Sequence, residues 1–217
     1  MGPIRIELTN YNAIPEDMRA LGCDHIGDID VYDGIIYGGI EGCEDGTGVL
    51  ATWNTTDLQM LRHSKTTMKG MPWVAVEPST TNIYSAVWND CCSLQVYDLQ
   101  TFEYIKSVTV GNETVHLPGE IQGGAFYEGE LYLAVNGDDG IWKVNVTSGE
   151  LSFVLSDLYN HHEYEVRDIQ LLNMYFICCL SCLDGGLGFL GSERSESWCD
   201  AHVRQLHEGS GEEHSQL

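Results

Sequence analysis

The sequence predicts an all-β protein built from a repeated unit of four short strands. Strand-like segments that carry a tyrosine recur at Tyr37, Tyr84 and Tyr132, with spacings of 47 and 48 residues. A tight turn precedes each tyrosine, and Asp33-Gly34 is the clearest because glycine accepts the positive φ of a two-residue hairpin. No helical periodicity runs through residues 27 to 170. Four antiparallel strands at this period are typical of one blade of a β-propeller.

The four strands of each unit can be assigned in order along the chain. An apolar strand, a tight turn and a second strand open each unit, at residues 27–38, 73–87 and 123–135. A polar loop leads to a third strand that starts at Gly48, Ser93 and Gly140. A turn that opens with Asn54, Asp98 or Asn145 then leads to the fourth strand.

This pattern divides the chain into three parts. Residues 1–26 hold an N-terminal strand and the loop that leads into the first blade. Residues 27–191 hold a partial propeller, with blades at about 27–64, 72–109 and 120–156 and a degenerate or truncated fourth at about 165–191. Residues 192–217 are rich in Ser, Glu, Gly and His, and we expect a disordered acidic tail. Propellers close with four to eight blades, so the chain is predicted to be a fragment or splice form of a larger propeller protein. A closed four-blade ring is the alternative.

Two segments carry a resemblance to known propellers. Residues Val96–Thr101 and Gly140–Glu150 resemble the turn between the third and fourth strands in propellers of the YVTN and quinoprotein-amine-dehydrogenase-β-chain type. The chain is also similar to gluconolactonase-like propellers. The resemblance covers roughly residues 24 to 170 and implies an architecture rather than an activity.

The gluconolactonase likeness implies a metal at the propeller axis. Such enzymes place metal ligands near the starts of the inner strands, and the metal acts as a Lewis acid on an ester or lactone carbonyl. The residues of this chain near those positions are His25, Asp28, Glu120 and Asp168.

The net charge of −23 bounds the partners of the chain. An acidic surface repels phosphate backbones, so we expect no nucleic-acid partner. The most apolar stretch, residues 171–191, is interrupted by Asn173, Asp184 and glycines, so no membrane span is expected.

Two features point to an extracellular or secretory-lumen location, although no signal peptide is visible in this chain. Asn54, Asn112 and Asn145 each open an N-x-S/T sequon and are predicted glycosylation sites; Asn and Thr also suit turns. The hairpin at Asp33-Gly34 also brings Cys23 and Cys43 within one residue of opposition, so a disulfide is predicted there.

Propeller topology collects acidic residues on one face. The loop that leads into a blade and the loop between its second and third strands lie at the same end, and here they carry Glu41, Glu44, Asp45, Asp90, Asp138 and Asp139. Such a face can bind Ca²⁺ or another divalent metal, or it can be a solvated rim. We therefore expect a non-catalytic binding module for a protein, glycan or cation ligand. The alternative is a metal-dependent lactonase or esterase, and whether the chain is an enzyme stays open.

Overall fold

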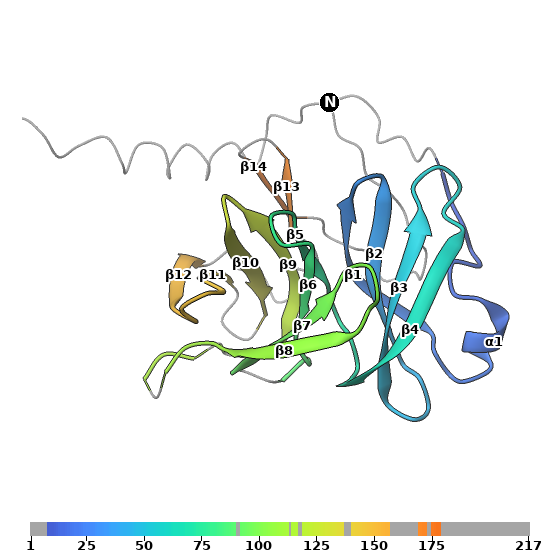
Figure 1. Cartoon of the computed structure of the whole chain (residues 1–217), viewed down its shortest axis with the longest axis horizontal. Helices are drawn as coiled ribbons and strands as arrows, with labels where there is room; N and C mark the ends of the chain where they lie inside the picture. Colours follow the sequence, from blue (N-terminus) through green and yellow to red (C-terminus); the bar gives the residue numbers. More distant parts are fainter. Residues whose placement is uncertain are drawn as a thin grey trace, which may run out of the picture.

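The computed structural model describes residues 8–89, 92–112, 114–116, 119–136, 140–156, 169–172 and 175–178. Three four-stranded antiparallel sheets follow one another along this part of the chain (Figure 1). Blade one consists of β1 (His25–Tyr32), β2 (Ile35–Glu41), β3 (Thr47–Asn54) and β4 (Met60–Lys69). Blade two consists of β5 (Ala75–Glu77), β6 (Asn82–Ser85), β7 (Ser93–Asp98) and β8 (Tyr104–Thr109). Blade three consists of β9 (Ile121–Tyr127), β10 (Glu130–Val135), β11 (Gly140–Val144) and β12 (Leu151–Ser156).

A further hairpin and the strand order establish the propeller. Strands β13 (Ile169–Leu172) and β14 (Tyr175–Cys178) pair antiparallel and belong to a truncated fourth blade. In every complete blade the strands lie in sequence order, from an inner strand to an outer one. The inner strands β1, β5 and β9 contact one another, and β13 contacts β9. The predicted β-propeller architecture is therefore confirmed.

The turn between the third and fourth strands repeats in all three blades. Asn54, Asp98 and Asn145 each accept a backbone hydrogen bond from the residue four positions later. Each also accepts backbone N–H groups through its side-chain Oδ1. The fourth residue on, Leu58, Phe102 or Gly149, has a positive φ. The sequence resemblance at this turn thus corresponds to one conserved local geometry.

Apolar side chains fill the spaces between successive blades. A cluster that includes Tyr37, Leu50, Met71 and Tyr97 lies between blades one and two. A second cluster, with Trp73, Leu94 and Leu133, lies between blades two and three. Among the described residues, no helix is long and apolar enough to cross a membrane.

The segment before blade one differs most from the prediction. Residues 8–22 form a cap that contains the one-turn helix α1 (Glu16–Arg19), where the sequence indicated only a loop. Ala13, Ile14 and Met18 of the cap pack with Trp53 on the face of blade one that is turned away from blade two. The strand predicted near the N-terminus falls mostly on residues 1–7, outside the described part of the chain.

Candidate functional site: the loop face and the propeller axis

Backbone hydrogen bonds bring the loops of each blade together at one end, here called the loop face. In blade one, Asp24 N–H donates to the carbonyl of Glu41 over 3.2 Å. In blade three, Glu120 N–H donates to Trp88 O over 2.8 Å, and Asn136 N–H donates to Glu120 O over 3.0 Å. The topology therefore places Asp24, Glu41 and Glu44 together, and it places Glu120 beside the loops that follow β6 and β10. The predicted residues Asp90, Asp138 and Asp139 lie outside the described residues.

Glu41 is a half-buried carboxylate of the loop face. Burial raises its pKa above the ordinary value, and the nearby His25 and a hydrogen bond from the Met71 backbone act in the opposite direction. The distance from His25 Nε2 to Glu41 Oε1 is 4.0 Å. The charge of Glu41 is therefore unfavourable in the folded state.

We expect the stability difference between Glu41→Gln and the parent chain to depend on pH. The raised pKa means that the stabilising contribution of protonated Glu41 is present at acidic pH and is lost as the pH rises through that pKa. Glutamine stays neutral, so the relative stability of Glu41→Gln should increase between pH values of about 4 and 7. Urea unfolding over this range measures it, with Glu44→Gln at an exposed position as the control. A relative stability that falls with rising pH would contradict the assignment.

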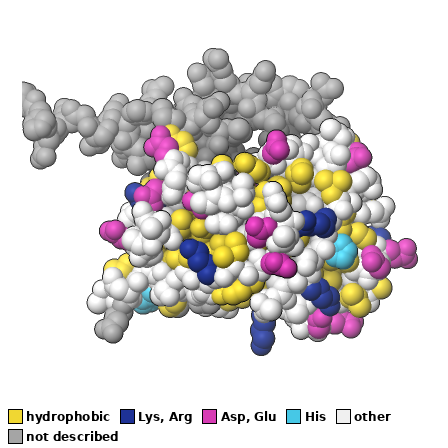
Figure 2. Space-filling model, in the orientation of Figure 1, with side chains coloured by type: hydrophobic (Ala, Val, Ile, Leu, Met, Phe, Trp, Pro, Cys, Tyr) yellow, Lys and Arg dark blue, Asp and Glu magenta, His cyan; other side chains and the backbone are white. Residues whose placement is uncertain are grey.

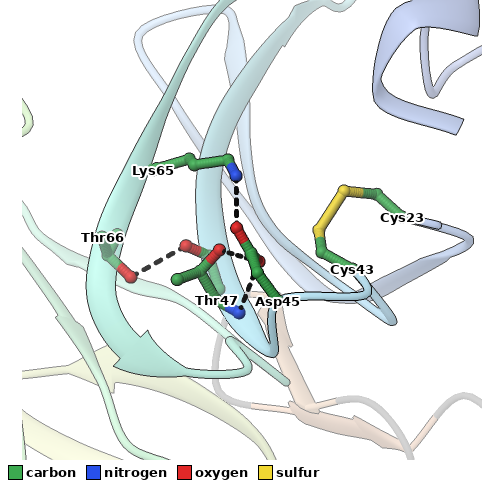
Figure 3. Close-up of polar contacts among 7 residues, drawn as sticks. Cys23, Cys43, Asp45, Thr47, Lys65 and Thr66 are labelled. Carbon is green, nitrogen blue, oxygen red and sulfur yellow. Dashed lines mark hydrogen bonds and ion pairs between the residues drawn. A yellow bond between two sulfur atoms is a disulfide. The ribbon is translucent and has the colours of Figure 1, made fainter. Parts of the chain in front are cut away.

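Asp45 has a different environment, because its charge is already partnered. Lys65 Nζ lies 2.5 Å from Asp45 Oδ2, and both the N–H and the hydroxyl of Thr47 donate to Asp45 Oδ1 (Figure 3). These hydrogen bonds, led by that of Lys65, hold the pKa of Asp45 well below its usual range. Asp45 therefore fixes the loop to β4, and Asp24, Glu41 and Glu44 are the other carboxylates of these loops.

Cys23 and Cys43 form a disulfide at the base of the same loops (Figure 3). The hairpin register predicted from Asp33-Gly34 holds from Ile29 to Tyr32, and a bulge between Ile26 and Ile29 then shifts it by one residue. The shifted register puts position 23 opposite position 43. Gly27 in the bulge has room for no side chain, because a Cβ there would lie 2.0 Å from Pro72 O. The bulge therefore explains how the cysteines meet.

Removal of this disulfide is expected to destabilise the propeller moderately. The bridge joins residues 20 apart, and closing a loop of that size contributes about 2–3 kcal/mol, mainly by restricting the unfolded chain. The double variant Cys23→Ala, Cys43→Ala should lose this amount in urea unfolding. Cys92→Ala, at an exposed cysteine, should change stability by less than about 0.5 kcal/mol. Equal behaviour of the two variants would contradict a structural role for the bridge.

The residues predicted as metal ligands have separate environments. His25 is exposed beside Glu41, Asp28 is buried, and Glu120 is exposed at the start of blade three. Asp168 lies outside the described residues, so the four-residue centre stays a prediction. In the described part of the chain, no group of three or more His, Cys, Asp or Glu residues is arranged to hold a metal ion. His25, Asp28 and Glu120 thus do not fit such a centre by themselves.

Two carboxylates of β1 connect blade one to the other blades at the axis. Asp28 Oδ2 accepts the N–H of Gly124 on β9 over 3.0 Å, and its Oδ1 accepts the N–H of Ile29. Asp30 Oδ2 accepts the N–H of Val76 on β5 over 2.8 Å. Gly124 has no room for a side chain, because a Cβ there would lie 2.9 Å from the Trp73 ring. These carboxylates hold backbone groups of neighbouring blades together.

Glu77 is a buried carboxylate of blade two that no sequence pattern singles out. Glu77 accepts hydrogen bonds from the hydroxyls of Ser79, Thr80 and Tyr84. Burial is the main cause, and the negative charge of Glu77 the next, that raises the pKa of Tyr84 to about 12. Tyr84 is therefore protonated at neutral pH, and the cluster stabilises the β5–β6 hairpin.

The three sequons differ in their surroundings. Asn54 and Asn145 are half-buried residues of the repeated turn, where blade two has Asp98. Asn145 Nδ2 also contacts Glu130 Oε1 at 3.4 Å. Asn112 is exposed, lies outside that turn, and its Oδ1 accepts hydrogen bonds from Thr114 and Val115. All three asparagines thus cap a turn through Oδ1, and Asn112 differs from the other two by its exposure.

Comparison with known proteins supports the fold and no finer assignment. No family model matches the chain, and no curated protein matches it. The glutaminyl cyclase of Myxococcus xanthus is similar at 11% identity with a TM-score of 0.52, over 72% of this chain and 61% of that one. U3-55K and the WD40 repeats of RRP9 are each 16% identical with TM-scores of 0.39; each match covers 63% of this chain, and 40% and 39% of the other. The chain thus spans less than two thirds of the length of each solved relative, and the likeness concerns the β-propeller fold.

Proposed function

We propose that this chain is a non-catalytic β-propeller module that binds a protein partner through its loop face. The observation that carries the proposal is the use of the axial carboxylates. Asp28 and Asp30 lie on the inner strand β1, the kind of strand near whose start gluconolactonase-like enzymes place metal ligands. Here the two carboxylates accept hydrogen bonds from backbone amides of blades two and three. Tyr84 and Glu77 are likewise paired with each other. Loops at one end of a rigid scaffold commonly carry binding, so this use of the axial carboxylates favours the exposed loops as the binding surface.

The loop face has the charge to select a basic partner surface. Glu44 and Glu120 are exposed, and Glu41 lies between His25 and the Met71 backbone. The positions of these loops are fixed by the disulfide, by the Asp45–Lys65 pair and by the hydrogen bonds of Glu120. A rigid acidic surface favours a cationic partner both in encounter rate and in specificity.

Binding of a basic peptide tests this function. We expect a fluorescein-labelled peptide of alternating arginine and serine to bind the full chain, and Glu44→Lys, Glu120→Lys to weaken it about tenfold. The control Glu16→Lys, Asp17→Lys makes the same change of charge on α1. Equal weakening by both variants would show that the peptide responds only to the net charge of the chain, and that the loop face is not its binding site.

Metal analysis distinguishes the hydrolase alternative. One observation at Glu120 favours that alternative. Glu120 has a φ of 55°, and among the described residues it is the one non-glycine residue with a positive φ that does not lie in a turn between paired strands. Stoichiometric tight Ca²⁺ or Zn²⁺ together with lactone turnover that is lost in Glu120→Gln would establish the enzyme. A chain without turnover that binds the basic peptide would establish the module.

We place the protein in the extracellular space or the secretory lumen, and we propose Asn112 as its glycan acceptor. A disulfide persists in oxidising compartments. Asn112 is exposed, whereas Asn54 and Asn145 are half-buried and Asn145 Nδ2 also contacts Glu130 Oε1. Expression of the full chain behind a secretion leader should give a mass shift that glycosidase treatment and Asn112→Gln both remove. A shift that depends on Asn145 and not on Asn112 would refute the assignment.

A further inference from the structure

The outer strand of blade one is basic, although the chain carries a net charge of −23. Strand β4 contains Arg62, Lys65 and Lys69, together with His63, and no Asp or Glu. All four of these side chains are exposed. Figure 2 shows Lys, Arg and His side chains gathered over β4 on this face of the molecule. The sequence placed the end of blade one near residue 64, so this strip extends beyond the predicted strand.

Strand β4 is also an open edge of its sheet. It pairs with β3 and lies last in the order β1-β2-β3-β4. With ten residues it is the longest strand in the described part of the chain. Its ladder with β3 is regular from Arg62 to Lys65, and the register shifts on either side of this stretch. An antiparallel edge strand presents every second pair of N–H and C=O groups outward, ready to pair with another extended chain.

Contacts on both sides of β4 position its charges. The Arg62 guanidinium lies 3.5 Å from the centroid of the Phe102 ring and donates to Gln100 O, both in blade two. Lys65 is held by Asp45. Positive groups thus flank the edge on both faces of the sheet. Because two of them are already ordered, a partner would lose less side-chain freedom on binding.

The outer strands of blades one and two also carry exposed apolar side chains. Leu61 of β4 is 53% exposed, and Tyr104 and Ile105 on β8, the outer strand of blade two, are 49% and 47% exposed. Exposed apolar groups beside ordered charges are features of interaction surfaces. Basic residues on an edge strand also prevent aggregation, so charge alone does not distinguish docking from protection.

We propose that β4 is the docking edge for an extended acidic peptide segment of a partner protein, which adds to blade one as a fifth strand. Backbone hydrogen bonds to the edge supply affinity, and glutamate or aspartate side chains opposite Arg62, Lys65 and Lys69 supply selectivity. This surface is formed by outer strands and differs from the loop face, so it is independent of the proposed function.

The test uses fluorescence anisotropy with the full chain and a labelled peptide of repeated Glu-Thr-Thr units, whose glutamates recur at the three-residue spacing of Arg62 and Lys65. We expect binding that weakens as salt is added. A peptide with lysine in place of glutamate should not bind. A third peptide has the same charges but N-methylated alternate amides, which remove edge pairing, and it should bind about tenfold more weakly.

Matched variants locate the binding. Lys69→Glu should weaken the glutamate peptide by about three- to fivefold, and Lys69→Arg should retain it. Arg19→Glu makes the same change of charge on the exposed side of α1 and should have no effect.

Three outcomes would overturn the proposal. In the first, the glutamate peptide does not bind and Lys69→Glu increases aggregation, so the basic residues of β4 serve only to prevent aggregation. The second is equal affinity of the N-methylated peptide or equal loss in Arg19→Glu, which removes the edge from the interaction. The third is binding of a sulfated polysaccharide, sensitive to Lys69→Glu, without binding of the glutamate peptide.

Discussion

Replacement of Asp28 by alanine is expected to lower the free energy of unfolding by about 3–4 kcal/mol. Its carboxylate accepts the N–H groups of Ile29 and Gly124, and the second of these joins blade one to blade three across 96 positions of sequence. Asp28 is 6% exposed, so water does not replace the lost acceptor. A hydrogen bond to a charged group contributes more than one between neutral groups, and a buried N–H left without a partner adds a desolvation penalty.

Urea unfolding and amide hydrogen exchange together test this expectation. Asp28→Asn retains an acceptor oxygen and should lose about half as much stability as Asp28→Ala. Hydrogen exchange at Gly124 should accelerate in the alanine variant because its acceptor is removed. If Asp28→Ala unfolds at the same urea concentration as the parent chain, the Asp28 carboxylate does not hold blades one and three together.

The repeat made the architecture predictable because it is encoded in local signals. Asp33-Gly34 determined the first hairpin, and Asn54, Asp98 and Asn145 marked the turns that the structure shows in one shared conformation. The hairpin register alone places Cys23 and Cys43 one residue away from direct opposition. The bulge near Gly27 shifts the register by the remaining residue. This bulge lies against Pro72, which belongs to another segment of the chain.

Other features lacked a local signal. The second half of β4 shows no alternation of apolar and polar residues, because this outer strand is largely exposed, and the predicted blade therefore ends near residue 64. The contact of Asp28 with Gly124 has no local signal in the sequence, because it depends on how blades one and three pack. The cap over residues 8–22 is held by Trp53 and Leu58 of blade one, which no pattern within the cap itself reveals.

Trp53→Ala is the second substitution with a large expected effect, a loss of about 4–5 kcal/mol in the free energy of unfolding. Trp53 on β3 is fully buried against Ala13, Ile14 and Met18 of the cap. Its Nε1 donates to Ala13 O over 2.8 Å. Removal of the ring leaves a cavity and an unpaired carbonyl, so the cap should detach before the blades unfold.

Two conservative substitutions separate the hydrogen bond from the packing. Trp53→Phe keeps most of the ring and loses the contact with Ala13, whereas Trp142→Phe removes an Nε1 that has no hydrogen-bond partner among the described residues. We expect Trp53→Phe to be the more destabilising by about 1–2 kcal/mol. Similar losses in both variants would show that the hydrogen bond to Ala13 contributes little.

The consequence for the fold concerns the exposed face of blade one. In a closed ring each blade packs between two others, but here residues 8–22 cover the face of blade one that is turned away from blade two. A chain without this cover exposes Ile36, Ile40 and Val49, which are buried in the cap cluster. Trp53→Ala should therefore associate with itself in a concentration-dependent way, as light scattering can measure. A monomeric variant with hydrogen exchange unchanged at Glu44, whose N–H donates to Leu21 O, would show that the cap remains bound without Trp53.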